Sequence, residues 1–163
     1  MTLALTSSAG FASATRRRLW IERVTGLGFA LPAGQGFWPA FWLLPADGTW
    51  PPEIDIFEVL GNSPTTAYAS VHSTTAGNTT FKVNYLPDLS AGFHTYGLSW
   101  QADMIRWYID GNEVAEMATP ADMNKPMFML LNLAVGDTGS WAGQYDPSLP
   151  TGHMQIDYVR AWQ

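Results

Sequence analysis

The sequence predicts an all-β fold, an antiparallel two-sheet β-sandwich of the jelly-roll type. Only 13% of the 163 residues are charged, about half the usual share, whereas eight residues are Trp. Short segments alternate between apolar and polar residues at period two, as half-buried strands do. Gly, Pro, Asn and Asp separate these segments, and the length suits a single domain.

Seven segments carry this strand pattern. In chain order they are residues 37–44, 53–60, 67–73, 95–101, 104–109, 126–135 and 154–162. In the first of them, Trp38 and Trp42 share one face. Phe37, Phe41 and Leu43 share the other face, because successive side chains of a strand point in opposite directions.

The later segments follow the same rule. Tyr68, Ser70 and His72 share one face of the third strand. The Asp-Gly-Asn sequence at residues 110–112 predicts a hairpin turn after the fifth strand. Asn132 interrupts the otherwise apolar sixth strand and therefore needs hydrogen-bond partners.

Turn-rich stretches join the strands and are expected to form loops along the rim of one face. These stretches are residues 45–52, 61–64 and 136–150. Helix is expected only as a turn near residues 120–125.

The second strand contains three carboxylates with an uneven spacing. Glu53 and Asp55 share a face, but Glu58 falls on the opposite, core face of a regular strand. A bare Glu in the core is costly. One extra residue near Ile56 and Phe57 would return Glu58 to the face of the other two acids, so the sequence predicts a β-bulge there.

This arrangement indicates a chemistry. Glu53 and Glu58 would be roughly 13 Å apart at their Cα atoms. Their side chains, leaning together, would approach the ~5–5.5 Å separation of a retaining glycosidase. Three such close carboxylates cannot all ionise freely, so at least one pKa should rise and supply an acid. From spacing alone, a divalent-cation site that includes His72 and a plain solvated row of acids remain open.

Six stretches resemble glycoside hydrolase family 16, the laminarinase and lichenase family. They are GQGFWPAFWLLP, PPEIDIFEVLG, the histidine of ASVHS, FHTYGLSWQADMIRWYIDG, NLAVG and IDYVRAW. They occur in family order and span about residues 31–163. The resemblance implies a curved jelly roll with a substrate cleft across its concave face. It also implies that β-glycosidic bonds are cut by double displacement.

The resemblance also implies residue roles. Glu53 matches the nucleophile, Glu58 the acid/base and Asp55 the assisting carboxylate between them. The E-x-D-x-x-E form resembles the bulged branch of laminarinases, agarases and carrageenases.

Other positions match binding residues of the family. Trp38, Trp42 and His72 match positions that line the sugar sites beside the cut bond, and Asn132 is a further candidate. Asp157 matches a position that often contributes to a structural calcium site. No cofactor is expected to be required beyond this calcium.

The N-terminal part departs from the family. Residues 1–30 lack the aromatic-Glu-x-Arg strand that precedes the jelly-roll core in the family. We therefore expect a divergent or truncated segment at residues 1–30 and a glycosidase-like domain at residues 31–163. A sheet edge left uncovered there would favour self-association.

The function expected from these features is endo-hydrolysis of β-1,3- or mixed β-1,3/1,4-glucan. The alternatives are another β-linked polysaccharide (bacterial exopolysaccharide, agar or carrageenan) and a non-catalytic carbohydrate-binding remnant. The net charge of −6 argues against nucleic acid, and no apolar run approaches the length of a membrane span. Such substrates predict secretion, although residues 1–14 lack the basic start of a signal peptide.

Overall fold

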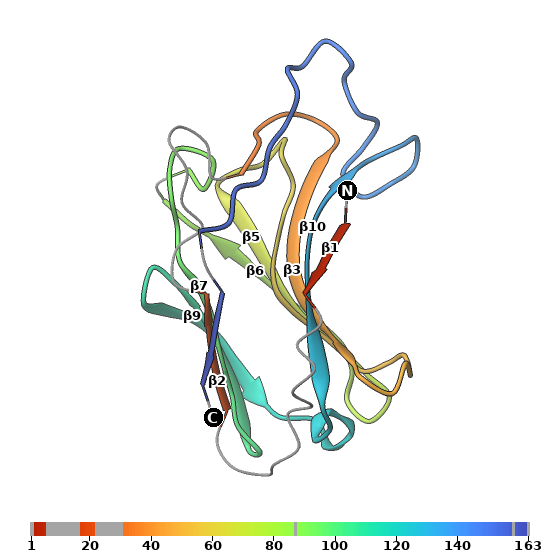
Figure 1. Ribbon diagram of the computed structural model, residues 1–163, viewed down its shortest axis with the longest axis vertical. Helices are drawn as coiled ribbons and strands as arrows, with labels where there is room; N and C mark the ends of the chain where they lie inside the picture. The colour runs from red at the N-terminus through yellow and green to blue at the C-terminus, as the bar shows by residue number, and fades with distance from the viewer. Residues whose placement is uncertain (1, 6–16, 22–30, 87, 158, 163) are drawn as a thin grey trace.

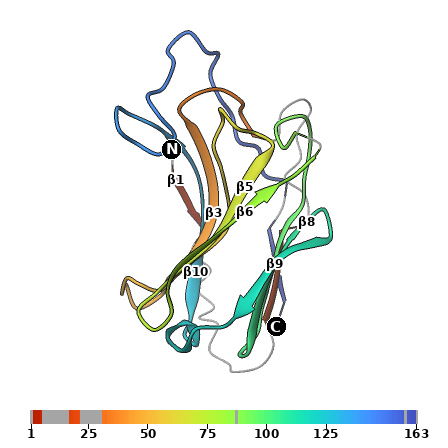
Figure 2. The ribbon, with the colours of Figure 1, turned by 180° about the vertical axis from the view of Figure 1, so that it is seen from behind.

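The computed structural model describes residues 2–5, 17–21, 31–86, 88–157 and 159–162. These residues form two antiparallel sheets that lie against each other as separate layers (Figures 1 and 2). Within the described parts, the only helical element is a short 3-10 turn, so the predicted two-sheet, all-β class is confirmed. No described helix is long and apolar enough to cross a membrane.

The first sheet has six strands, several of them long and curved (Figure 1). Their spatial order is β1 (Thr2–Leu5), β10 (Met127–Val135), β3 (Phe37–Pro45), β4 (Glu53–Val59), β5 (Thr66–Ser73) and β6 (Gly77–Asn84). The second sheet has the order β11 (Arg160–Trp162), β2 (Arg17–Ile21), β7 (Tyr96–Trp100), β8 (Met104–Ile109) and β9 (Asn112–Ala118). The 3-10 turn η1 (Ala121–Met123) precedes β10, as predicted.

Six of the seven predicted strands are present with bounds that agree to within one residue. The seventh is much shorter, because only its last part, β11, pairs with another strand, which is β2. Residues 151–157 still alternate between exposed and half-buried positions, and Met154 and Ile156 pack against the core. The alternating sequence therefore indicates an extended segment with one side on the core, whether or not that segment pairs with another strand.

Strand β6 was not among the predicted strands. It lies at the edge of the six-stranded sheet, and its side chains are mostly exposed and polar, in the sequence Gly-Asn-Thr-Thr-Phe-Lys-Val-Asn. Charged and polar side chains of this kind are typical of protected edge strands, whose hydrophobic signal is weak.

The hydrophobic core lies between the sheets and fixes β4 in place. Ile54, Ile56, Phe57 and Val59 of this strand are all buried. Phe57 stacks on Tyr96 of β7, with ring centroids 4.0 Å apart. Burying these side chains is the main force that holds the strand against the facing sheet.

The predicted hairpin turn joins β8 and β9. Ile109 pairs with Asn112, so Asp110 and Gly111 form a two-residue loop. Both have positive φ values, 50° and 78°, as a type I′ turn requires. The Asp110 carboxylate also accepts a 2.8 Å hydrogen bond from the Thr95 backbone N–H, which fastens the turn to the strand beside it.

Backbone hydrogen bonds fasten the loop after β10 to the start of β3. Gly136 donates to the Gly36 carbonyl, and the Gly36 N–H donates to the Ala142 carbonyl. A Cβ on Gly36, whose φ is +92°, would lie 2.3 Å from the Tyr145 Cα. This close approach requires glycine, and it fixes the loop that carries Trp141.

Candidate active site

The predicted bulge is present in β4. Asp55 pairs with Ser70 and Glu58 with Tyr68, so three steps along β4 match two steps along β5. On the other side of β4 the register with β3 also shifts, and the residue at the shift is Ile56. The extra residue keeps Ile56 and its apolar neighbours in the core and returns Glu58 to the outer face.

The ladder then assembles one functional face. Residues paired across antiparallel strands project to the same side of the sheet. The registers of β3, β4, β5 and β10 therefore place the following side chains together on the outer face: Trp38, Trp42, Glu53, Asp55, Glu58, Tyr68, Ser70, His72 and Asn132. The site residues expected from the sequence lie on this face, with the exception of Asp157.

Glu53 is half-buried at the start of β4. The indole N–H of Trp50 donates a 2.5 Å hydrogen bond to its Oε2 atom. Burial, followed by the nearby Asp55 charge, raises the pKa of Glu53 to about 7, although the Trp50 hydrogen bond opposes the rise. Glu53 therefore exchanges its proton near neutral pH.

Glu58 is half-buried beyond the bulge. Trp38 donates its indole N–H to Glu58 Oε1 at 3.0 Å. Burial first, and the Asp55 charge second, raise the pKa of Glu58 to about 7 as well. Both glutamates therefore respond to the Asp55 charge, and the Glu53 charge adds to the rise in the Glu58 pKa.

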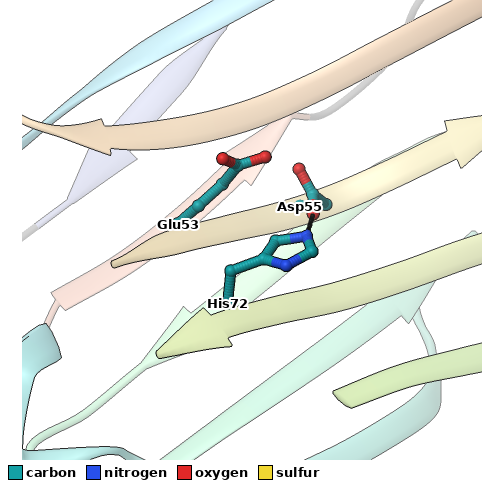
Figure 3. Close-up of side chains that lie close together, drawn as sticks. All are labelled: Glu53, Asp55 and His72. Carbon is teal, nitrogen blue, oxygen red and sulfur yellow. Dashed lines mark ion pairs between the residues drawn. The ribbon is translucent and has the colours of Figure 1, made fainter. Parts of the chain in front are cut away.

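Asp55 and His72 form an ion pair at the centre of the face. Asp55 is 3% exposed, and its Oδ2 atom lies 3.4 Å from His72 Nε2 (Figure 3). The long contact is better described as an ion pair than as a hydrogen bond, because Oδ2 makes no well-formed hydrogen bond to a described group. Contact with the Asp55 carboxylate raises the pKa of His72 to about 9, against the opposing effect of burial.

Trp42 and Asn132 contact each other. The Trp42 indole N–H donates a 2.7 Å hydrogen bond to Asn132 Oδ1. The polar interruption of the apolar β10 is thus satisfied by a side chain from the neighbouring strand. This contact orients the Trp42 ring on the outer face.

Two further aromatic residues join the site. Trp50 is 64% exposed, and its ring lies 6.2 Å from that of His72. Trp141 contacts Trp38 and Tyr68 edge-on, at ring-centroid distances of 5.4 and 4.6 Å. Neither is predicted as a site residue from the sequence. Trp50 could have been found from its position three residues before Glu53, whereas the position of Trp141 depends on how its loop folds back.

Three other ring residues pack in or against the core and do not lie on the outer face. Trp107 is buried between the sheets, and its indole N–H donates a 2.9 Å hydrogen bond to the Asp55 backbone carbonyl. Trp100 is half-buried against the core. His94 is buried and contacts Asp110 at 2.7 Å, which is a structural role.

A cation could find ligands at one described group. Glu53, Asp55 and His72 offer atoms that all lie within 4.8 Å of one another (Figure 3). A protonated imidazole cannot bind a metal, so at neutral pH a cation would have to displace the His72 proton. Asp157 is exposed, and the described residues show no group of acids around it that resembles the six to eight oxygen ligands of calcium.

The sequence model of glycosyl hydrolases family 16 matches residues 1–160 of the chain. The chain belongs to glycosyl hydrolase family 16. Among its relatives is endo-1,3-1,4-beta-glycanase ExsH of Rhizobium meliloti, 48% identical over 81% of this chain and 28% of that protein. A beta-glucanase of Rhodothermus marinus is 34% identical over 82% of this chain and 54% of that protein.

Solved structures of family 16 proteins share the fold. The endo-beta-1,3-glucanase of Pyrococcus furiosus superposes with a TM-score of 0.77 at 33% identity, over 94% of this chain and 62% of that one. The laminarinase of Rhodothermus marinus gives a TM-score of 0.75 at 26% identity, over 91% of this chain and 65% of that one. The chain thus spans about a quarter of the length of its glycanase relatives and under two thirds of these structures.

Proposed function

We propose that the chain carries the catalytic residues of an endo-acting, retaining glycoside hydrolase that cleaves β-1,3- or mixed β-1,3/1,4-glucan. The observation that carries the proposal is the β4 bulge, which places Glu53, Asp55 and Glu58 on one face. Both glutamates have pKa values near 7, so one protonated and one ionised carboxyl group can coexist there. Double displacement requires this combination.

In the first step, ionised Glu53 attacks the anomeric carbon and forms a glycosyl–enzyme ester. Protonated Glu58 donates its proton to the glycosidic oxygen as the bond to the leaving sugar breaks. In the second step, Glu58, now ionised, takes a proton from water, and the resulting hydroxide attacks the anomeric carbon. Glu53 leaves, and the configuration at that carbon is retained.

Asp55 supports both steps without reacting itself. Its charge raises the pKa of Glu53 and of Glu58, and its contact with His72 keeps a counter-charge at the centre of the site. The two glutamates have similar pKa values, so their different roles rest on their family positions. The hydrogen bonds from Trp50 to Glu53 and from Trp38 to Glu58 orient the two carboxylates.

The aromatic side chains suit a polysaccharide. Trp38, Trp42, Trp50 and Trp141 present rings around the carboxylates, and sugar rings have apolar faces that pack on such surfaces. The relatives named endo-1,3-1,4-beta-glycanase are 46–48% identical, whereas that named beta-glucanase in Rhodothermus marinus is 34% identical. Because the more similar relatives are named glycanases and not glucanases, another β-linked polysaccharide, such as a bacterial exopolysaccharide, is the alternative substrate.

Reducing-end release on laminarin, lichenan, agarose and carrageenan tests the proposal. Turnover on laminarin or lichenan is the expected result, and Glu53→Gln should abolish it while the protein stays folded. Survival of most of the rate in that variant would remove Glu53 as the nucleophile. Oligosaccharide binding without any product from the unmodified protein would instead identify a carbohydrate-binding remnant.

Three further proposals concern the whole protein. We infer secretion from the substrate class. We also infer that residues 1–30 are a divergent N-terminal segment, whose strands β1 and β2 join the two sheets of the domain. Strand β1 pairs with β10 on one side and forms the edge of its sheet, so self-association there would appear as a concentration-dependent mass in light scattering. Calcium binding through Asp157 would appear as a rise in melting temperature on adding calcium, lost in Asp157→Ala.

A further inference from the structure

The bulge in β4 is joined to the opposite sheet by one side chain. Trp107 lies on β8, in the five-stranded sheet, and its indole N–H donates a 2.9 Å hydrogen bond to the backbone carbonyl of Asp55. Asp55 is the last residue before the extra residue of the bulge. The bond therefore crosses the core and ends where the β4 ladder is interrupted.

The position of the Asp55 carbonyl, beside the interruption of the ladder, gives its hydrogen bond a structural role. Asp55 keeps its partners Trp42 and Ser70, but the ladder is disrupted directly after it, at the extra residue Ile56. A hydrogen bond from the core to the Asp55 carbonyl supports the chain at this irregular point. Trp107 is 1% exposed, so its own N–H also requires a partner inside the protein. The Asp55 carbonyl is that partner.

The ring of Trp107 is itself held firmly. Phe81 of β6 lies 5.6 Å away, between ring centroids. Beside Trp107 the register of β8 with β9 also shifts, because Trp107 pairs with Ala115 but Tyr108 pairs with Glu113. An irregularity in the second sheet thus accompanies the residue that contacts the bulge in the first.

We propose that Trp107 is a positioning residue for the reaction, whose indole N–H fixes the β4 bulge and thereby aims the Asp55 and Glu58 side chains. The proposal rests on the proposed function, because it assigns a role in that chemistry to a residue that cannot touch the substrate. If the bulge relaxes, Asp55 moves relative to His72 and Glu58 turns toward the core. Small displacements of this kind slow enzymes severely.

The test compares Trp107→Phe with Phe81→Leu in the full chain. The first removes the N–H, whereas the second perturbs the same part of the core and leaves the bond intact. Because Trp107→Phe also removes ring volume, a third protein carries 3-benzothienylalanine in place of Trp107, which keeps the ring shape and replaces N–H with sulfur. This third protein keeps the question answerable if Trp107→Phe does not fold.

We expect kcat to fall about 10- to 100-fold in the two Trp107 variants with KM changed less than about twofold. Phe81→Leu should keep kcat within about threefold at a comparable loss of stability. Equal kcat losses in Phe81→Leu and Trp107→Phe at equal stability, or wild-type kcat with the benzothienyl ring, would overturn the proposal.

A second readout does not depend on turnover. Carbon-13 NMR of the glutamate carboxyl groups follows the Glu58 titration, and loosening the bulge should lower the Glu58 pKa, because water enters and Asp55 moves away. Phe81→Leu should leave this titration unchanged. If the unmodified protein degrades no polysaccharide, the proposed function fails, but an unchanged Glu58 titration in the Trp107 variants is what would refute the positioning role.

Discussion

Glu58 ionises where both burial and a neighbouring carboxylate oppose its charge. Its folded-state pKa of about 7 exceeds the ordinary value of 4.5, so ionisation destabilises the native state. This penalty is absent below pH 4.5, grows between pH 4.5 and 7, and is complete above pH 7. Glu58→Gln, which stays neutral, should therefore be more stable than the unmodified protein at pH 8, by about 1–3 kcal/mol, and equal to it at pH 4.

Urea denaturation at the two pH values measures this difference. The same variant should lose most of its activity, because it cannot donate or accept the proton. Equal stability of the two proteins at pH 8 would show that ionised Glu58 does not destabilise the folded protein. It would also contradict burial as the cause of the raised Glu58 pKa.

Asp55 determines the protonation of the groups around it. Asp55→Asn removes the charge that holds the His72 pKa near 9, so this pKa should fall toward its ordinary 6.5. A histidine with a raised folded-state pKa stabilises the protein fully below pH 6.5 and loses that contribution as pH rises through 9. The variant should lose this contribution, and the loss should be clearest near pH 5, where Glu53 and Glu58 are still protonated and removing the Asp55 charge relieves no repulsion among them.

Proton NMR of the histidine ring measures the first effect directly. His94 and His153 are not among the residues of the site face, so their ring signals serve as internal controls. In addition, the pH optimum of any remaining activity should shift to lower pH, since Asp55 no longer raises the pKa values of Glu53 and Glu58. A His72 titration that stays near pH 9 would contradict the ion pair.

At the scale of elements, Asp122 connects η1 to the turn between β5 and β6. Its carboxylate accepts hydrogen bonds from the Ser73 and Thr75 hydroxyls and from both the hydroxyl and the backbone N–H of Thr74. These bonds lower the pKa of Asp122 to about 2, although burial opposes them. Asp122→Ala should reduce the free energy of unfolding by about 1–3 kcal/mol, because several donors lose their acceptor together.

Chemical denaturation of Asp122→Ala at neutral pH tests this estimate. The contribution of Asp122 is present above pH 4 and is lost as pH falls toward 2, so the two proteins should converge in acid. Asp137→Ala, in the loop after β10, is a matched control that removes an exposed Asp. A similar loss in both variants would show that the turn does not depend on Asp122.

The elements differ in how far the sequence could predict them. The bulge was predictable, because Glu58 and the four apolar residues of β4 could not all satisfy a strict alternation. Strand β6 was not predictable, since an exposed polar edge strand has little hydrophobic pattern. The last strand was predicted too long, because an alternating sequence does not show which residues pair with a neighbouring strand. The Trp107 and Trp141 contacts depend on the sheets and loops meeting in space, which no local pattern contains.

At the scale of the whole molecule, the two sheets share one core, and residues from both support the functional face. β4 and β7 meet through Phe57 and Tyr96, and β8 reaches the bulge through Trp107. A ligand on the outer face should therefore stabilise the entire sandwich against unfolding, not only the strands that it touches.

Glu53→Gln provides the means to test this coupling, because an oligosaccharide should bind it without being cut. At a ligand concentration 100 times Kd, binding should add about 2.7 kcal/mol to the free energy of unfolding and raise the melting temperature in one transition. Trp141→Ala in the same background removes the ring that contacts Trp38 and Tyr68. It should weaken binding while lowering the ligand-free melting temperature only slightly, since Trp141 is 45% exposed and lies outside the core between the sheets. Calorimetry with laminarin and lichenan oligosaccharides measures both effects. Two separate transitions, of which the ligand shifts only one, would show that the sheets unfold independently and that the site is not supported by the facing sheet.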